Sequence, residues 1–173
     1  TYAIYAGAAE GDNVVGIDPK NHENGYLAGI IAGYTTESNV IGSIGGMDIP
    51  TVVRVLEGYC QGAQSVDEGI ECLYAYPGSW DDVQKGKEAA QAMIDAGADV
   101  FFHDASLVGV GMIQAAGEAG VHAIGFGTCQ DDVAPDAVLT SALDGIGETM
   151  VLAVDMYMND ELQSTGMMRP GMA

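Results

Sequence analysis

Asn39-Val-Ile-Gly-Ser-Ile-Gly-Gly-Met-Asp-Ile-Pro50 is the stretch that decides the fold. Its short apolar run, residues 40–44, ends at a pair of glycines, and Pro50 suits the first turn of a helix. Residues 51–59 then carry apolar side chains at helical spacing. The stretch therefore predicts a strand, a tight turn and a helix. Because ligands of open α/β sheets bind outside the carboxyl ends of the strands, we expect a site at the turn 45–49.

Apolar strands and helices continue to alternate from Val40 to Leu143. The expected strands are 40–44, 70–76, 99–103, 122–126 and 138–143, and the expected helices are 51–65, 79–97 and 108–119, with Ser79 as an N-cap. A loop joins the last two strands. This order favours an α/β fold with a parallel, doubly wound sheet and right-handed crossovers. Residues 38–143 are therefore expected to form one complete lobe.

The two ends of the chain do not make a domain of their own. Residues 1–37 predict two short strands and one helix, which cannot bury both faces of a parallel sheet. They therefore need partners that these residues do not supply. Residues 148–158 predict a last helix, and the Gly/Pro/Met-rich tail 166–173 is expected to be frayed.

The charge balance is strongly acidic, with 25 acidic against 5 basic residues and a formal net charge of -20. Nucleic acids and anionic membrane surfaces bind basic residues, so both are poor candidates for partners. A solvated acidic surface explains this charge, and a preference for neutral or cationic ligands is the alternative. The sequence has no initiator Met, no signal peptide and no apolar run that could span a bilayer, so we expect a processed or excised chain.

The cysteines show no metal-ligand or redox spacing. Cys60, Cys72 and Cys129 are far apart, and an odd count leaves at least one thiol free. We expect Cys72 to be a small core residue of a buried strand and Cys129 to be a thiol in a loop.

Three segments, in matching order and spacing, carry a resemblance to a known family. They are Glu23-Asn-Gly-Tyr-Leu-Ala-Gly29, Ile44-Gly-Gly-Met-Asp-Ile-Pro50 with Gly58 and Gly62 after it, and Gly78-Ser-Trp-Asp81 with Lys85-Gly-Lys87. Together they resemble the basic membrane protein family of solute-binding lipoproteins, the purine-nucleoside receptors of ABC transporters.

This resemblance implies a type I periplasmic-binding fold, in which two α/β lobes close on a ligand. Residues 1–37 would be a remnant of an N-terminally truncated first lobe, 38–143 the second lobe, and 144–173 a helix that returns to the first lobe, with a frayed tail. The implied partners are a nucleoside-like small molecule and an ABC transporter permease, with no nucleic acid. The implied location is extracytoplasmic, in the periplasm or on the outer face of the cell membrane, through a lipid anchor outside this chain.

The resemblance also implies a site at the strand exits. Phe102, with Phe101 as the alternative, is similar in position to the aromatic residue that stacks on the purine, although both rings could equally belong to the core. Gly127 and Cys129 stand where the family has aspartates, and Asp144 stands where it has a basic residue, which would favour a neutral or amine-bearing ligand. The expected ligand-binding residues are Met47, Asp48, Phe102, His103, Asp104, Gly127, Cys129, Gln130, Ser141 and Asp144.

Catalysis, cofactor binding and metal binding have weaker support in the sequence. His103 and Asp104 are adjacent on a strand and point to opposite faces, so they cannot share a catalytic site with Ser106 and Cys129 unless the strand has ended. No dinucleotide, P-loop or nucleophile-elbow motif is present, and the histidines lie on separate elements. We therefore expect no enzyme, no cofactor and no metal. The alternatives are the sensing domain of a transcriptional regulator, a small α/β enzyme, or a folded fragment that binds nothing.

Overall fold

The computed structural model describes residues 2–5, 13–161 and 165–168, which divide into two compact units. One unit combines the segments 1–21 and 144–173, and the other comprises residues 22–143. The sequence predicted the start of the larger lobe at residue 38. The compact unit begins at His22 instead, because helix α1 (Asn21–Thr35) packs against helix α2 (Pro50–Gln64) within it.

The larger unit contains a five-stranded parallel sheet in the order β4-β3-β5-β6-β7. The strands are β3 (Val40–Gly45), β4 (Glu71–Ala75), β5 (Val100–Asp104), β6 (His122–Gly127) and β7 (Val138–Leu143). The predicted parallel α/β fold, with its five strands in this region, is thus confirmed. The chain runs from β3 outward to β4 and then returns to the other side of β3 for β5, so the strand order reverses between β3 and β5.

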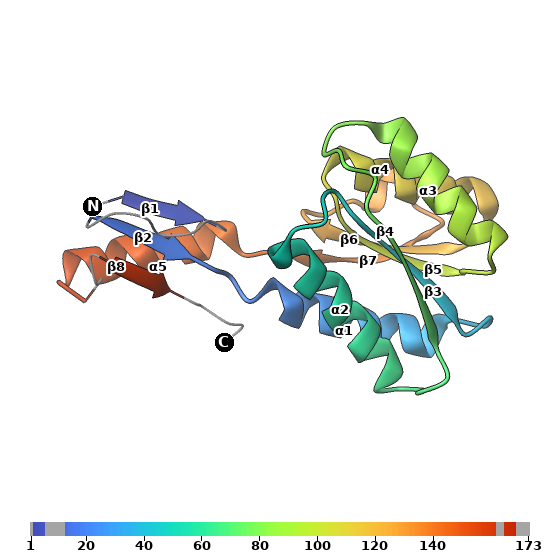
Figure 1. Cartoon of the computed structure of the whole chain (residues 1–173), viewed down its shortest axis with the longest axis horizontal. Coiled ribbons are helices and arrows are strands. Elements are labelled where there is room, and N and C mark those ends of the chain that lie inside the picture. The colour runs from blue at the N-terminus through green and yellow to red at the C-terminus, as the bar shows by residue number, and fades with distance from the viewer. Residues whose placement is uncertain (1, 6–12, 162–164, 169–173) are drawn as a thin grey trace. The chain divides into compact units, whose positions relative to one another are not determined.

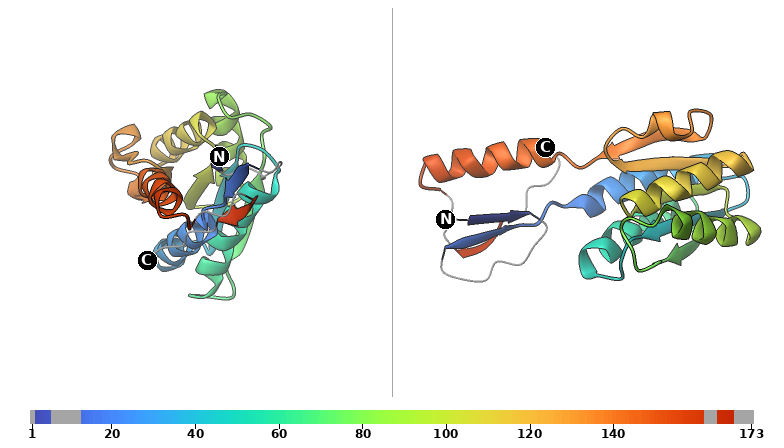
Figure 2. Two further views of the ribbon diagram at one scale, coloured as in Figure 1. Left: turned by 90° about the vertical axis from the view of Figure 1, so that its left-hand side faces the viewer. Right: turned by 90° about the horizontal axis from the view of Figure 1, so that it is seen from above.

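Helices cover both faces of this sheet (Figure 1). Helices α1 and α2 cover one face, over a core that includes Tyr59, Phe102 and Ile124. Helices α3 (Val83–Asp95) and α4 (Leu107–Ala119) cover the other face, over a core that includes Phe101 and Met112. The right-hand view in Figure 2 looks onto this second face. Alternate residues of β5 therefore enter different cores, as expected for a strand buried on both sides.

Glycines allow the helices of each pair to approach closely. A Cβ atom at Gly29 of α1 would collide with the carbonyl oxygen of Tyr59 on α2, and one at Gly62 of α2 would collide with that of Tyr26. On the other face, Gly86 of α3 makes the same kind of approach to α4. The glycines at these contacts are required because a side chain would push two backbones apart.

The α3 helix begins one turn later than the sequence suggested. Its N-cap is Asp82, whose carboxylate accepts hydrogen bonds from the backbone N–H groups of Gln84 and Lys85 at 3.1 and 3.3 Å. The Ser79 hydroxyl instead accepts from the N–H groups of Asp81 and Asp82. An aspartate and a serine are both strong N-caps, so the local sequence alone does not choose between them.

Asp99, just before β5, fixes the turn that leads into β3. Its carboxylate accepts a hydrogen bond from the Thr36 hydroxyl at 2.6 Å and from the N–H groups of Glu37 and Ser38 at 2.7 and 2.8 Å. Three donors on one carboxylate tie this turn to the start of the neighbouring strand.

A disulfide joins Cys60 of α2 to Cys72 of β4, with a Cα–Cα distance of 5.9 Å. Cys72 packs against the core as the sequence predicted. The sequence did not predict its pairing with Cys60, which forms because α2 packs over the sheet close enough to bring the two residues together. Cys129 is free and exposed. In the part of the chain that the structure describes, no helix is both long enough and apolar enough to cross a bilayer.

The smaller unit contains a three-stranded parallel sheet in the order β1-β2-β8 and the helix α5 (Ile146–Met158). Its strands are β1 (Tyr2–Tyr5), β2 (Val14–Ile17) and β8 (Thr165–Met168). The expectation of a frayed tail was wrong for residues 166–168, which pair with β2. Residues 169–173 lie outside the described part of the chain.

Candidate functional site

The carboxyl ends of β3 and β5 meet where the strand order of the larger unit reverses, the usual place for a ligand in a doubly wound sheet. The Gly46 N–H donates a hydrogen bond to the Asp104 carbonyl at 2.9 Å. The Gly46 carbonyl accepts from the Ser79 N–H at 3.0 Å, and the Trp80 carbonyl accepts from the Leu107 N–H at 2.9 Å. Three exit loops, after β3, β4 and β5, are thus joined into one rim.

Met47, Asp48 and Trp80 are among the exposed side chains of this rim. Met47 is 37% and Trp80 39% exposed, and the Trp80 ring lies over Gly46, where a Cβ atom would collide with it. Asp48 is exposed as well. Burial raises the pKa of the nearby Tyr76 hydroxyl, and the negative charges of Asp48 and Glu57 raise it further. The rim therefore offers an aromatic surface beside a carboxylate.

Phe102 does not reach this rim. Its ring is fully buried, stacks on Tyr59 with a centroid distance of 5.1 Å and meets Phe126 edge-on at 5.6 Å. Phe101 is equally buried, in the core on the opposite face. Both rings are thus core residues in this structure, which was the alternative to ligand stacking. Asp104, at the end of β5, is half-buried and is the β5 residue that meets the rim.

His103 is buried and belongs to a hydrogen-bond network with the loop after β6. Its Nε2 lies 2.8 Å from Oε1 of Gln130, and the Gln130 N–H donates to the Ser141 hydroxyl oxygen at 3.0 Å. Burial lowers the pKa of His103 to about 4, against a smaller opposing effect of the Gln130 hydrogen bond. His103 is therefore neutral at physiological pH, and its expected contact with a ligand stays a prediction.

The loop after β6 presents Gly127 and Cys129. Gly127 has a φ of 85°, a conformation that favours glycine, and Cys129 is exposed. The structure thus joins His103 and Ser141 to this loop through hydrogen bonds to Gln130. Asp144 belongs to the other compact unit, where burial raises the pKa of its carboxyl group. Its expected contact with a ligand stays a prediction.

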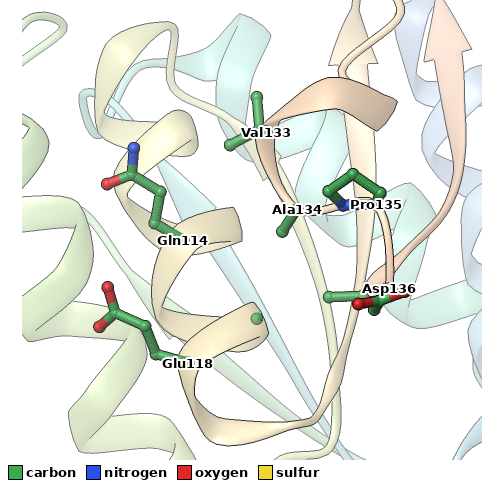
Figure 3. A pocket seen from close by; sticks show the side chains of 8 residues that line it. Gln114, Glu118, Val133, Ala134, Pro135 and Asp136 are labelled. Carbon is green, nitrogen blue, oxygen red and sulfur yellow. The ribbon is translucent and has the colours of Figure 1, made fainter.

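A separate groove of about 320 Å³ lies between α4 and the segment that precedes β7 (Figure 3). Gln114, Glu118 and Asp136 supply its polar groups, and residues 133–135 supply apolar ones. Glu118 is already paired with Lys87 at 2.7 Å. None of the expected site residues lines this groove. Within the described residues, no group of three His, Cys, Asp or Glu side chains is arranged to hold a metal ion.

The larger unit is thus an α/β lobe with a rim of polar and aromatic groups at its strand exits, the geometry of a ligand-binding lobe. The chain belongs to the family of PnrA-like ABC transporter substrate-binding proteins, whose model matches residues 1–173. This match confirms the resemblance to basic membrane proteins.

Similar proteins come from several organisms. Basic membrane protein B of Borrelia garinii subsp. bavariensis is 33% identical over 150 residues, covering 86% of this chain and 44% of that protein. The ABC transporter nucleoside-binding protein BmpA of Lactococcus lactis subsp. cremoris is 40% identical over 104 residues, covering 60% of this chain and 30% of that protein. This chain therefore spans less than half the length of these relatives.

A solved structure shows the similarity over nearly all of this chain. An ABC transporter solute-binding protein from Aeropyrum pernix K1 superposes with a TM-score of 0.84 and 28% identity, covering 98% of this chain and 51% of that one. The expected periplasmic-binding-protein-like fold class is therefore confirmed.

Proposed function

We propose that this chain is part of an extracytoplasmic solute-binding protein of an ABC transporter, which binds a small polar ligand without chemical change. The observation that carries the proposal is the rim at the strand-order reversal, in a chain of this family. The ligand would contact exposed groups of the rim, among them Met47, Asp48 and Trp80, together with Asp104 and the loop residues 127–129. Closure of a second lobe over this rim would enclose it.

A nucleoside-like ligand is the first candidate for this site. Its support is the name of the BmpA relative, which describes a nucleoside-binding protein. Trp80 offers a partly exposed ring, and stacking of a base on an aromatic ring contributes on the order of 1 to 3 kcal/mol. Asp48 and Asp104 would accept hydrogen bonds from hydroxyl or amino groups. Because no aspartate stands at Gly127 or Cys129, an amine-bearing metabolite is the second candidate.

The proposed partner is a permease, and the proposed location is outside the cytoplasm, with a lipid anchor beyond these residues. The disulfide between Cys60 and Cys72 supports the location, because disulfides persist in oxidising compartments and are rare in the cytosol. Protease treatment of spheroplasts, whose outer layers are removed and whose cytoplasmic membrane is intact, provides the test. Digestion of the protein in these spheroplasts is expected, and full protection contradicts an external location.

A non-catalytic role agrees with the burial of a residue that could act as a general base. His103, the strongest candidate for a general base, is buried and bonded to Gln130. The alternative of a regulator's sensing domain has less support, because the relatives above 30% identity carry the names of membrane and nucleoside-binding proteins.

Titration calorimetry of the full-length protein with adenosine, inosine, guanosine, uridine, spermidine and choline tests the binding function. We expect one of these classes to bind, and Asp48→Asn to weaken that binding by about fivefold, the effect of roughly one hydrogen bond. Glu68→Gln is the matched control, since it removes an exposed carboxylate from the turn before β4, at the amino ends of the strands and away from the rim. The absence of any heat of binding, or an equal loss in both variants, would contradict the proposed site.

A further inference from the structure

The His103 side chain makes its hydrogen bond to a specific acceptor. The Gln130 atom at 2.8 Å from His103 Nε2 also accepts the Phe126 backbone N–H, at 2.9 Å. An N–H group donates only to an acceptor, so this atom is the amide oxygen and not the amide nitrogen. His103 Nε2 must then carry the proton and donate it. The network therefore fixes both the orientation of the Gln130 amide and the tautomer of His103.

The other ring nitrogen of His103 has no polar partner. Nδ1 is buried without a hydrogen bond, and the ring lies against Gly109 of α4, where a Cβ atom would collide with Nδ1. A proton on Nδ1 would create a buried cation with no acceptor, which is strongly unfavourable. The ring is therefore held as a neutral donor that serves Gln130 alone.

Gln130 connects this donor to the loop between β6 and β7. Its oxygen binds the end of β6 through Phe126, and its N–H binds β7 through the Ser141 hydroxyl. Gly125 leaves the space for this arrangement, since a Cβ atom there would lie 2.6 Å from the Ser141 oxygen and 2.8 Å from the Gln130 oxygen. The loop 127–131 is thus attached to three strands, β5, β6 and β7, through one glutamine.

We propose that His103 and Gln130 are positioning residues that hold the loop 127–131 in the geometry that receives the ligand. Both side chains act from the interior, without touching the ligand, whereas Gly127 is half-buried and Cys129 is exposed to solvent. A loop ordered before binding loses less conformational entropy on binding, so the network raises affinity. The proposal has two parts. The loop part is that the network orders the loop 127–131, and the ligand part is that this order raises affinity for the ligand. The ligand part rests on the proposed function, and the loop part does not.

The loop part is tested in the 173-residue chain with a nitroxide label on Cys129. Cys60 and Cys72 are paired, so Cys129 is the free thiol. Electron paramagnetic resonance should show greater label mobility in Gln130→Met and His103→Leu, because both remove the hydrogen bond. His103→Gln should restore the low mobility, since its amide N–H can donate to the same oxygen. Gln114→Met is the matched control on α4 and should leave the label unchanged.

Several outcomes would overturn the loop part. These are unchanged mobility in Gln130→Met when thermal unfolding shows that the variant is folded, an equal rise in Gln114→Met, or no restoration by His103→Gln. Nitrogen-15 NMR of the imidazole adds a signature independent of stability. We expect a proton on Nε2 and none on Nδ1 at neutral pH, and the opposite tautomer would refute the network.

The ligand part is tested by calorimetry of the same variants in the full-length protein. Gln130→Met and His103→Leu should weaken binding by about fivefold for the one lost hydrogen bond, and His103→Gln should bind within about twofold of the wild type. A loop that loosens with no change in affinity would overturn the ligand part and leave the proposed function intact. If the wild type binds no solute, the proposed function and the ligand part both fail, and the label experiment still decides the loop part.

Discussion

Removing the disulfide should destabilise the larger unit by an amount that follows from its position. Cys60 and Cys72 are 12 residues apart in sequence, and the chain-entropy model gives a loop of this size a stabilisation of about 3 kcal/mol. Alanine at both positions keeps small apolar side chains on α2 and β4. The loss should therefore come from the freer unfolded chain rather than from a cavity. A loss of about 3 kcal/mol is a large share of the free energy of unfolding of a typical folded domain, which is about 5 to 15 kcal/mol.

Urea denaturation of the double variant Cys60→Ala/Cys72→Ala measures this loss. Trp80 is the only tryptophan, and its ring rests on Gly46, so its fluorescence reports the folding of residues 22–143. We expect the midpoint to fall by about 1 to 2 M urea for a slope of roughly 2 kcal/mol per M. Cys129→Ala is the control and should leave the midpoint unchanged.

Two results would refute the reasoning on the disulfide. One is a double variant whose free energy of unfolding lies within about 0.5 kcal/mol of the wild type, well below the loop-closure estimate. The other is reaction of the unreduced, urea-unfolded wild type with a thiol reagent at all three cysteines, since the disulfide leaves Cys129 as the single reactive thiol.

Three further predictions concern stability and use urea denaturation as the assay. The pKa of His103 falls from 6.5 in the unfolded chain to about 4 in the folded one. Between these pH values the unfolded state binds a proton that the folded state does not. The free energy of unfolding should therefore drop by about 3 kcal/mol as the pH falls from 6.5 to 4. This contribution, complete above pH 6.5, should vanish in His103→Gln, and an identical pH dependence of both proteins would contradict it. Gly29→Ala should destabilise by about 3 kcal/mol because its Cβ would meet the backbone of α2, and a loss below about 0.5 kcal/mol would refute the close contact. Asp99→Ala should lose about 2 kcal/mol, because it leaves three donors of residues 36–38 without their carboxylate, and a loss below about 0.5 kcal/mol would show that the turn does not depend on it.

The sequence predicted the order of elements in the larger unit because apolar runs alternate there with helical spacing between clear turn signals. Residues 40–44 and 138–143, for example, correspond closely to β3 and β7. It missed β8, because the tail around Gly166 has no alternating or continuous apolar pattern of a strand. That strand is defined by its parallel pairing with β2, a long-range contact that local spacing does not encode.

Phe102, the expected aromatic contact, lies in a core and not at the candidate rim, and the sheet register explains why. Asp104 pairs with Gly45, and its carbonyl oxygen accepts the Gly46 N–H, so β5 remains part of the sheet through Asp104. Phe102 is two residues inside this edge, where side chains enter a core and not a rim. The sequence predicted an apolar strand at 99–103, whereas β5 is Val100–Asp104. A shift of one or two residues in the predicted end of the strand decides whether a side chain lies at the rim or in a core.

The glycines of the recognised segments have a structural role that separates family membership from ligand identity. Cβ atoms at Gly25, Gly58 and Gly86 would each collide with a backbone carbonyl oxygen of the facing helix, and one at Gly46 would collide with Trp80. At the three helix contacts a side chain would push two backbones apart whatever the ligand is, whereas at Gly46 it would displace the Trp80 ring. In the loop 127–129, the positive φ of 85° constrains Gly127, whereas the side chains of Thr128 and Cys129 are exposed. Under the proposed function, substitutions at these two exposed positions should change the ligand while the helix contacts keep the fold, so specificity should follow them and not the glycine segments.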